Sequence, residues 1–371
     1  MRLGDVVREY KETCKGSKDG FPIVGLEHLI PEEINLKMWD EEKENTFTKM
    51  FRKGQVLFGR RRAYLKKAAV APFDGICSGD ITVIEAIHDK ILPELLPFII
   101  QNDSLFNFAV GNSAGSLSPR VKWENLKNYE FNLPDLAEQK RLAELLWAAN
   151  DAKEAYKRLL TLTDDLVKSQ FIEMFGDPLE NPFGWEQVTL KDISKGKLSY
   201  GSGASATTYD GKTRYVRITD ITDSGELNDD IKSPSIYEAI HALNEGDILF
   251  ARSGATVGKT YCHNEKYGKC IYAGYLIRLI PDKEKVLPEY VFHYTKTDYY
   301  NNFVAINKRT VAQPNINAKQ YGDLVICVPP LEIQNRFVEL IHQTDKSKFE
   351  LQQTILSLEN TIKSIMLEKV G

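Results

Sequence analysis

Two short loops carry most of the residues that could do chemistry, and both are rich in basic side chains. The later loop follows the strand-like run 246–250 and presents Arg252, Ser253 and Lys259. The earlier loop follows a similar run at 53–58 and presents a larger basic set: Arg60, Arg61, Arg62, Lys66 and Lys67. Arginine and lysine on a rigid turn can hold phosphates, and arginine can also hydrogen-bond the edge of guanine in the major groove. Because the position is basic in both loops while the residues differ, we favour one scaffold with two different readouts over two merely solvated turns.

A second candidate set lies in the two loops that precede a closing strand. The earlier of these loops carries Arg120 and Lys122, and the later one carries Lys308 and Arg309. We include these four residues as candidate phosphate or base contacts. Three tyrosines could pack or stack nearby, although lone aromatic residues more often belong to a core: Tyr64, Tyr272 and Tyr275.

Motifs that would indicate an enzyme are incomplete. The run Gly254 to Thr260 has three residues between its glycines where a phosphate loop needs four, and a strand-like segment follows it instead of a helix. Two nuclease-like arrangements, at 134–140 and 281–285, are collapsed into one turn or a helix start, and 181–184 only partly resembles a methyltransferase motif. The cysteines and histidines do not have metal-ligand spacing. We therefore expect no catalytic residue, no metal and no cofactor in this chain.

The bulk composition indicates a soluble globular protein with room for two domains. The chain has 371 residues and a formal charge of −4, so any surface that binds nucleic acid must be local. It has neither an apolar run long enough to cross a membrane nor an apolar signal region at its start. Its five cysteines form no CxxC pair and are expected to be reduced thiols. These features predict a cytoplasmic protein.

The strongest organisational signal is a repeat. The segment 133–141 matches 328–336 at an offset of 195 residues, with Pro, Leu, Gln and Arg in the same places. Earlier blocks match too: 53–58 with 245–250 at an offset of 192, and 76–79 with 271–274 at 195. Because each copy of the Pro-Leu-Gln stretch ends a strand-like run and opens a helical pattern, the repeat predicts two complete domains, each followed by its own long helix.

Both long segments show the 3-4 spacing of an apolar helical stripe. At 1.5 Å per residue, each helix should be about 60 Å long. A single helix of this length with one apolar stripe needs a partner, and we expect the two copies to pair antiparallel as a coiled coil. The residues predicted to pair are Leu142, Leu145, Ala149, Tyr156, Leu159, Leu166, Phe337, Ile341, Leu351, Ile355, Leu358 and Ile362. The alternative is that each helix packs only on its own domain.

We therefore predict an α+β protein with two similar mixed α/β domains in a pseudo-twofold arrangement. The predicted boundaries are 1–134 for the first domain, 135–177 for the first helix, 178–329 for the second domain and 330–371 for the second helix.

These features resemble the DNA-specificity subunit of type I restriction-modification systems over nearly the whole chain. The resemblance rests on the block Gly-Asp-Ile-Leu-Phe-Ala-Arg-Ser-Gly-Ala-Thr-Val-Gly-Lys at 246–259 and on the Pro-Pro-Leu-x-x-Gln helix start at 329–334, with its twin at 134–139. The first copy departs from the pattern, since Arg60-Arg61-Arg62 replaces Arg-Ser-Gly and Asp135 replaces the second proline.

The resemblance implies two target-recognition domains separated by conserved spacer helices, and no catalysis by this chain. It implies two modification subunits and further restriction subunits as partners. S-adenosylmethionine, ATP and Mg²⁺ would then act in those partners.

From this we expect a protein that recognises a split, asymmetric site on double-stranded DNA, one half-site per domain, with the helices as a spacer. Two alternatives remain: a specificity module of a fused nuclease-methyltransferase, or an interaction scaffold that never touches bases. A third class, a self-contained nuclease or methyltransferase, would be active without partners.

Overall fold

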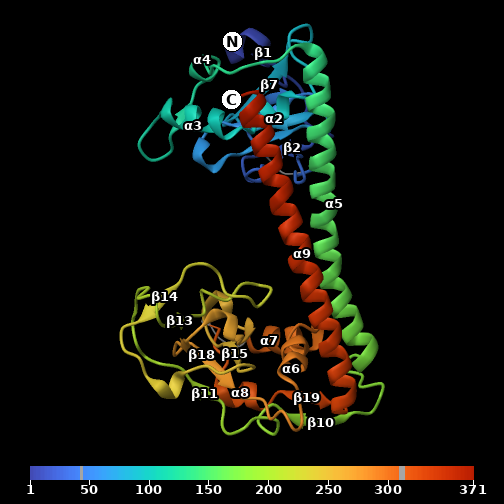
Figure 1. The fold of residues 1–371 in the computed structure, drawn as a ribbon, viewed down its shortest axis with the longest axis vertical. Helices are drawn as coiled ribbons and strands as arrows, with labels where there is room; N and C mark the ends of the chain where they lie inside the picture. Colours follow the sequence, from blue (N-terminus) through green and yellow to red (C-terminus); the bar gives the residue numbers. More distant parts are fainter. Residues whose placement is uncertain (42–44, 309–313) are drawn as a thin grey trace. The chain divides into compact units, whose positions relative to one another are not determined.

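The computed structural model describes residues 1–41, 45–308 and 314–371. The chain divides into two compact units. Unit 1 consists of Met1–Arg158 and Leu351–Gly371, and unit 2 of Leu159–Glu350. Each unit therefore contains one mixed α/β domain and a segment of each of two long helices, labelled α5 (Leu136–Phe175) and α9 (Leu331–Lys369) in Figure 1.

The domain of unit 1 is built on a four-stranded sheet in the order β1-β7-β4-β5 and a three-stranded sheet in the order β2-β6-β3. Two consecutive helices, α2 and α3, follow β7, and Asn102 caps the start of the second through a hydrogen bond from Ser104 N. The elements are α1 (Leu3–Val6), β1 (Val7–Glu9), β2 (Ile23–Val24), β3 (Lys49–Phe51), β4 (Val56–Gly59), η1 (Ala63–Leu65), β5 (Ala68–Val70), β6 (Gly75–Cys77), β7 (Ile81–Ala86), α2 (Leu96–Ile100), α3 (Asp103–Gly111), β8 (Ser113–Ala114), β9 (Arg120–Val121) and α4 (Trp123–Leu126).

The domain of unit 2 repeats this plan with a sheet in the order β11-β18-β15-β16. Its described elements are β10 (Glu186–Thr189), β11 (Ser199–Tyr200), β12 (Ala206–Thr208), β13 (Arg214–Val216), β14 (Lys232–Pro234), η2 (Ala239–His241), β15 (Ile248–Ala251), η3 (Gly254–Thr256), β16 (Thr260–Cys262), η4 (Glu265–Tyr267), β17 (Cys270–Tyr272), β18 (Leu276–Leu279), α6 (Pro288–Tyr294), α7 (Asp298–Lys308), α8 (Ala318–Gly322) and β19 (Val325–Val328).

The strand register confirms that the two domains are copies. Leu57 lies opposite Val83 across the β4–β7 ladder, and Leu249 lies opposite Arg278 across β15–β18. These pairs differ by the same offsets, 192 and 195, that relate the two halves of the sequence. The parallel pairs β2–β6 and β13–β17 keep the same correspondence. One backbone scaffold is therefore used twice with different side chains.

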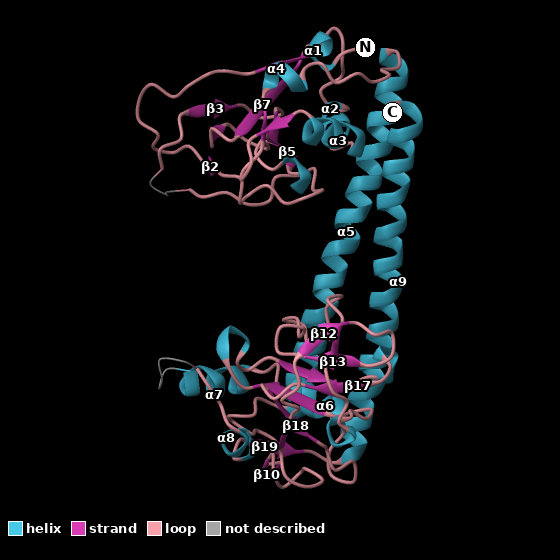
Figure 2. Ribbon diagram, turned by 90° about the vertical axis from the view of Figure 1, so that its left-hand side faces the viewer, coloured by secondary structure: helices cyan, strands magenta, loops and turns pink. Residues whose placement is uncertain are grey.

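The two long helices are α5 (Leu136–Phe175) and α9 (Leu331–Lys369), and within each unit their segments run antiparallel (Figures 1 and 2). In unit 1, Leu142 of α5 and Met366 of α9 belong to one hydrophobic core, and the Lys157 ammonium lies 3.6 Å from the Glu359 carboxylate. In unit 2 the ring centroids of Phe171 and Phe337 are 5.4 Å apart. These contacts confirm the predicted fold class of two mixed α/β domains with paired long helices. No helix among the described residues is both long and apolar enough to span a membrane.

The predicted stripe was right for α9 but partly wrong for α5. Phe337 and Ile341 are buried, and the later predicted positions of α9 are half-buried. On α5, Leu142 is buried and Ala149 and Tyr156 are half-buried, but three predicted leucines are exposed: Leu145, Leu159 and Leu166. The inner positions are Leu146, Lys153, Leu160 and Val167. The spacing on α5 is thus four then three, as on α9, and the three leucines lie on the outer face.

A buried glutamine in the first turn of each long helix fixes that helix to its domain. The Gln139 amide donates to Pro134 O at 2.9 Å and accepts from Leu92 N at 2.9 Å. The Gln334 amide does the same with Pro329 O at 2.8 Å and Leu287 N at 2.8 Å. Both side chains are almost fully buried, and each satisfies backbone groups that water cannot reach. The Pro-Leu-Gln stretch is therefore a structural joint.

Replacing Gln334 by leucine should cost about 2–3 kcal/mol of unfolding free energy, because it leaves buried backbone groups without partners. Urea denaturation of the full chain measures this. Asn335→Ala is the matched control, since Asn335 is the exposed neighbour on the same helix, and it should change stability by less than about 0.5 kcal/mol. Equal losses of unfolding free energy in the two variants would contradict the role of Gln334 as a structural joint.

Candidate nucleic-acid interface

In the first domain, the two predicted basic loops meet at the end of the central strand β4. In unit 1, Val121 N donates to Arg60 O at 3.0 Å and Arg62 N donates to Pro119 O at 2.8 Å. Arg61 and Arg120 are thereby paired across an isolated antiparallel bridge. A third loop joins them, because Arg60 N donates to Asp80 O at 3.0 Å. We call loops 60–62, 78–80 and 119–121 the first cradle.

Unit 2 contains the same arrangement. Ile316 N donates to Arg252 O at 2.9 Å, and Arg252 N donates to Tyr275 O at 3.0 Å. Ser253 is bridged to Asn315 as Arg61 is to Arg120. We call loops 252–254, 273–275 and 314–316 the second cradle. The third loop of this cradle, 314–316, is not basic, and the predicted Lys308 ends α7 and is not part of these three loops.

The first cradle is organised by Asp80. Its carboxylate accepts from Arg120 Nε at 2.7 Å and from Arg61 Nη1 at 3.1 Å. Hydrogen bonds from Arg120 and then Arg61 hold the pKa of Asp80 below its ordinary value, although partial burial opposes this. One carboxylate therefore orients two arginines without neutralising both. The guanidinium groups keep unused N–H donors for an acceptor such as a guanine edge or a phosphate.

The second cradle has a different chemistry on the same backbone. The Arg252 guanidinium lies over the Tyr200 ring at 4.7 Å from its centroid, and its Nε donates to Asn315 Oδ1 at 3.3 Å. Tyr275 occupies the position of Asp80 and is 62% exposed. Stacking on an aromatic face and a neutral amide thus replace the carboxylate as the groups that orient the arginine. The two cradles should therefore recognise different bases.

The backbone of the first cradle requires an unusual conformation. Arg62 and Lys66 have positive φ values of 55° and 50°, and the corresponding residues of unit 2 are Gly254 and Gly258, with φ values of 71° and 90°. The divergent first loop therefore keeps the backbone conformation of the second without its glycines. A residue with a Cβ is strained in this region, so the arginine at position 62 is retained at a cost in stability.

We expect Arg62→Gly to be about 1 kcal/mol more stable than Arg62→Ala, because only glycine relieves this strain. Both variants should lose the same DNA affinity, because both remove the charge. Thermal unfolding of the full chain and DNA titration of the assembled complex test the two statements separately. If the glycine variant were no more stable than the alanine variant, the strain would be absent.

Three of the predicted lysines have partners within the chain: Lys66, Lys67 and Lys259. The Lys66 ammonium lies 2.6 Å from Asp103 and 3.4 Å from Glu32, where the first domain meets the long helices. Lys67 Nζ donates to Leu26 O at 2.8 Å, and its counterpart Lys259 donates to Ile221 O at 3.2 Å and pairs with Asp223 at 2.8 Å. These ammonium groups hold neighbouring segments in place, so we no longer rank them with the arginines.

The remaining predicted residues differ in their surroundings. Arg62 and Lys122 are exposed, and their side chains form no ion pair within the described part of the chain. Lys308 is half-buried at the end of α7, and Arg309 lies outside the described residues. Of the three tyrosines, Tyr272 is fully buried in the core, whereas Tyr64 and Tyr275 are exposed. Arg62 and Lys122 thus remain the best phosphate contacts of the first domain.

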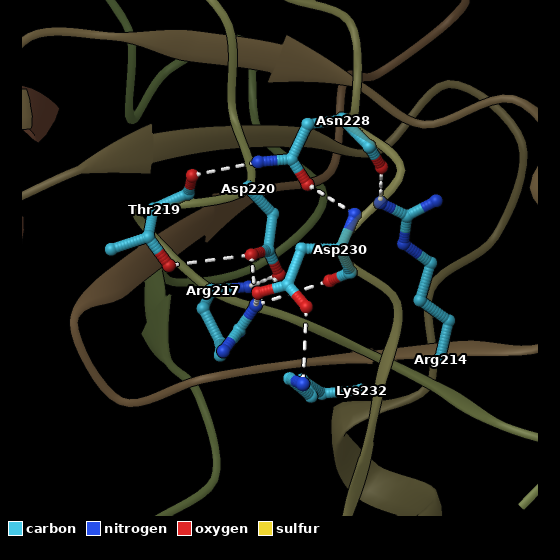
Figure 3. A network of polar contacts seen from close by, with 7 residues as sticks. All are labelled: Arg214, Arg217, Thr219, Asp220, Asn228, Asp230 and Lys232. Carbon is cyan, nitrogen blue, oxygen red and sulfur yellow. Dashed lines mark hydrogen bonds and ion pairs between the residues drawn. The ribbon is translucent and has the colours of Figure 1, made fainter. Parts of the chain in front are cut away.

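A further arginine of unit 2 has a structural role (Figure 3). Arg217 donates to Asp220 through Nε at 3.0 Å and to Asp230 through Nη2 at 3.0 Å. Asn228 extends the network, since its side-chain amide donates to Thr219 O and its backbone carbonyl accepts from Arg214. This network fixes the loop between β13 and β14. The two aspartates hold the Arg217 side chain against this loop.

Sequence reasoning missed four residues of the cradles: Asp80, Tyr200, Asn315 and, as a cradle member, Tyr275. They are not basic, so the search for arginine and lysine passed over them. The available signal was the repeat, because Asp80 and Tyr275 are corresponding positions next to a matched block. Among the described residues, no group of three or more His, Cys, Asp and Glu side chains could hold a metal ion.

Comparison with protein families matches residues 1–159 and 182–360 to the type I restriction modification DNA specificity domain. The chain belongs to this family. The two matched segments coincide with the two copies that carry the cradles. Family membership and the duplicated fold thus agree on two DNA specificity domains in one chain.

Individual relatives are more distant. The type I restriction enzyme MjaIX specificity subunit of Methanocaldococcus jannaschii is 22% identical over 76% of this chain and 69% of the relative. The MjaX specificity subunit of the same organism is 31% identical, but over 50% of this chain and 45% of its own length. A solved structure from work on assembly of a type I R-M system superposes with a TM-score of 0.61 at 22% identity, covering 100% of this chain and 96% of the other. At that identity the superposition shows the fold alone.

Proposed function

We propose that this chain is a non-catalytic specificity subunit that recognises a split, asymmetric site on double-stranded DNA. Each cradle reads the bases of one half-site in a major groove, and the surrounding lysines and arginines neutralise phosphates. The observation that carries the proposal is one three-loop backbone that presents an Asp80-bridged arginine pair in unit 1 and a tyrosine-stacked arginine in unit 2. Identical scaffolds with different side chains fit two different half-sites.

In this proposal the long helices act as a spacer between the half-sites, separated by about one helical turn of DNA, or about 34 Å. The chain acts in the cytoplasm with two modification subunits and with restriction subunits. S-adenosylmethionine, ATP and Mg²⁺ belong to those partners.

Exchange of the cradle loops tests this function. Cells carrying the wild-type chain and its partners should show methylation at one bipartite motif. Replacing residues 251–260 by the corresponding loop of a relative should change one half of that motif and leave the other half unchanged. An unchanged motif would favour the scaffold alternative, and methylation by the purified chain without partners would favour a self-contained enzyme.

A specific surface supports the partner part of the proposal. In unit 2, three exposed leucines follow the outer face of α5, with exposed fractions between 47% and 60%: Leu159, Leu162 and Leu166. Their spacing is that of a second heptad stripe, and the inner stripe of α5 is already packed in both units. We assign this outer face to a helix of a modification subunit.

Replacing Leu159 and Leu166 by glutamate should weaken assembly with the modification subunit by about 100-fold, since each buried leucine contributes about 1.5 kcal/mol or more. Co-purification and titration of the modification subunit measure the loss. The melting temperature of the free chain should not fall, because both positions are exposed. Ser169→Glu, also exposed on α5, is the control. If the double variant assembled normally, the modification subunit would not bind the outer face of α5.

A further inference from the structure

Unit 1 contains a cavity of about 320 Å³ that the DNA-binding proposal does not use. Its walls come from the segment around Glu32 and Ile34, from α2 and α3, from Lys153 of α5 and from the last turns of α9. This is the place where the first domain meets its helices. The volume lies at the lower end of the range of ligand pockets, about 300–1,000 Å³.

Several buried polar groups at this cavity lack partners. Asn102 is 9% exposed, and its Nδ2 has no hydrogen-bond acceptor. The carbonyl of Gln101, Oε1, is buried without a donor. Lys153 is 4% exposed, and its closest ion pair is with Glu154 at 4.0 Å, beyond hydrogen-bond distance. Buried polar groups are normally satisfied, so this concentration of unpaired groups at one cavity points to a bound molecule.

The second copy shows the same position closed. Ser104 and Met366 of unit 1 correspond to Tyr299 and Phe171 of unit 2, both of which have larger side chains. Phe171 packs against Phe175 and Tyr290, with ring centroids 4.9 and 5.5 Å away. The counterpart of Lys153 also differs, because Lys348 forms a direct ion pair with Asp164. Smaller side chains and a lysine without a hydrogen-bonded carboxylate thus distinguish unit 1.

The charges around the cavity favour an anion. Its acidic groups already have cations: Lys363 lies 2.9 Å from Glu32, Lys66 lies 2.6 Å from Asp103, and Lys157 lies 3.6 Å from Glu359. Lys153 is the wall residue whose charge is not hydrogen-bonded to a carboxylate within the described chain. Burial, followed by the charge of Lys157, lowers the pKa of Lys153 from its ordinary value. The charges of Glu33, Glu154 and Glu359 oppose this shift, but none of these carboxylates lies within hydrogen-bond distance of the Lys153 ammonium. A ligand carboxylate would supply that hydrogen-bond acceptor.

We propose that this cavity binds a small carboxylic acid with an apolar aliphatic or aromatic body. The carboxylate accepts hydrogen bonds from Lys153 Nζ. The body packs against the apolar wall formed by Phe98, Ile362, Met366 and Leu367. Because the wall combines the domain with both helices, an occupied cavity stabilises unit 1 by mass action. This site is independent of DNA recognition.

The test uses the full-length chain and 4-phenylbutyrate as the probe, with 4-phenylbutylamine as its cationic counterpart. Saturation-transfer NMR and thermal unfolding should show saturable binding of the carboxylate and a rise in melting temperature with its concentration. The amine should do neither. An absence of saturable carboxylate binding, or equal binding of the amine, would overturn the proposal.

Two variants locate the site. Lys153→Met removes the charge, and the double variant Ser104→Tyr with Met366→Phe fills the cavity with the residues of the second copy. Each should weaken binding at least about tenfold. Lys348→Met, at the matching position of unit 2, should leave binding unchanged. Circular dichroism confirms folding, and unchanged binding in both folded cavity variants would show that the probe binds elsewhere and refute the assignment.

Discussion

Replacing Arg61 and Arg120 together by alanine should abolish recognition of one half-site while the other half-site is still read. The two guanidinium groups are held by one carboxylate, so they are positioned before DNA arrives and lose little entropy on binding. Each base contact of this kind contributes about 1–3 kcal/mol of discrimination. The double variant should therefore lose about 100-fold or more in affinity for its own site.

The measurement compares the assembled complex on three DNA duplexes: the intact motif, and the motif with either half-site scrambled. The variant should be insensitive to scrambling of the first half-site and keep wild-type sensitivity to the second. Arg2→Ala is the matched control, because Arg2 belongs to the same unit but forms an exposed ion pair with Glu130 outside the cradle. If the variant still distinguished intact from scrambled sequence at both half-sites, the first cradle would not be a base-recognition site.

Phosphate contacts should behave differently from base contacts. Replacing Arg62 and Lys122 by alanine should weaken binding to every sequence alike and reduce the slope of log K against log salt by about 2, because each lost phosphate contact releases one fewer counterion. The ratio of the affinities for specific and nonspecific DNA should stay unchanged in this variant. The Arg61 and Arg120 variant should lower that ratio, so the two effects can be told apart.

Phe171→Ala should be the most destabilising single substitution at the joint of unit 2, with a loss of about 3–5 kcal/mol. Phe171 is 2% exposed and stacks among the rings of Phe175, Tyr290 and Phe337. The truncated side chain leaves a cavity that these large, interlocked rings cannot fill without leaving their positions. Urea denaturation of the full chain, followed by tryptophan fluorescence, measures the change.

Ile172 is the control for this substitution because it is adjacent on α5 but 41% exposed. Ile172→Ala should cost less than about 1 kcal/mol. Similar losses for the two variants would mean that α5 is stabilised by its own helix propensity and not by packing on the second domain.

The error in the α5 stripe has a clear physical origin. Leu145, Leu159 and Leu166 are more apolar than Lys153, so a search for the most apolar stripe selects them. Burial is decided by the partner helix, whose inner positions include Phe337 and Ile341. The corresponding positions of α5 are Leu142 and Leu146. The repeat contained this answer. Subtracting 195 from the numbers of positions 341, 348, 355 and 362 on the inner face of α9 gives the corresponding inner positions of α5: Leu146, Lys153, Leu160 and Val167.

The sequence alone determined the duplication, the two long helices and the joint that connects each helix to its domain. These depend on local rules: the period of apolar residues, the proline that ends a strand and the glutamine that opens a helix. Matching blocks also indicated that the recognition loops occupy equivalent places in the two domains. Such features are encoded within a few turns of chain and survive without tertiary information.

Only the tertiary structure decided which basic residues act together. Arg61 and Arg120 are joined through Asp80, which lies 19 and 40 residues from them in the chain. Lys66 is equally basic but is held by Asp103 and Glu32 at a different place. The charge of a side chain is a property of the sequence, whereas its availability to DNA depends on which carboxylates the fold brings within hydrogen-bond distance. That is why the arginine cradles, and the buried Lys153 at the cavity of unit 1, emerge only from the folded chain.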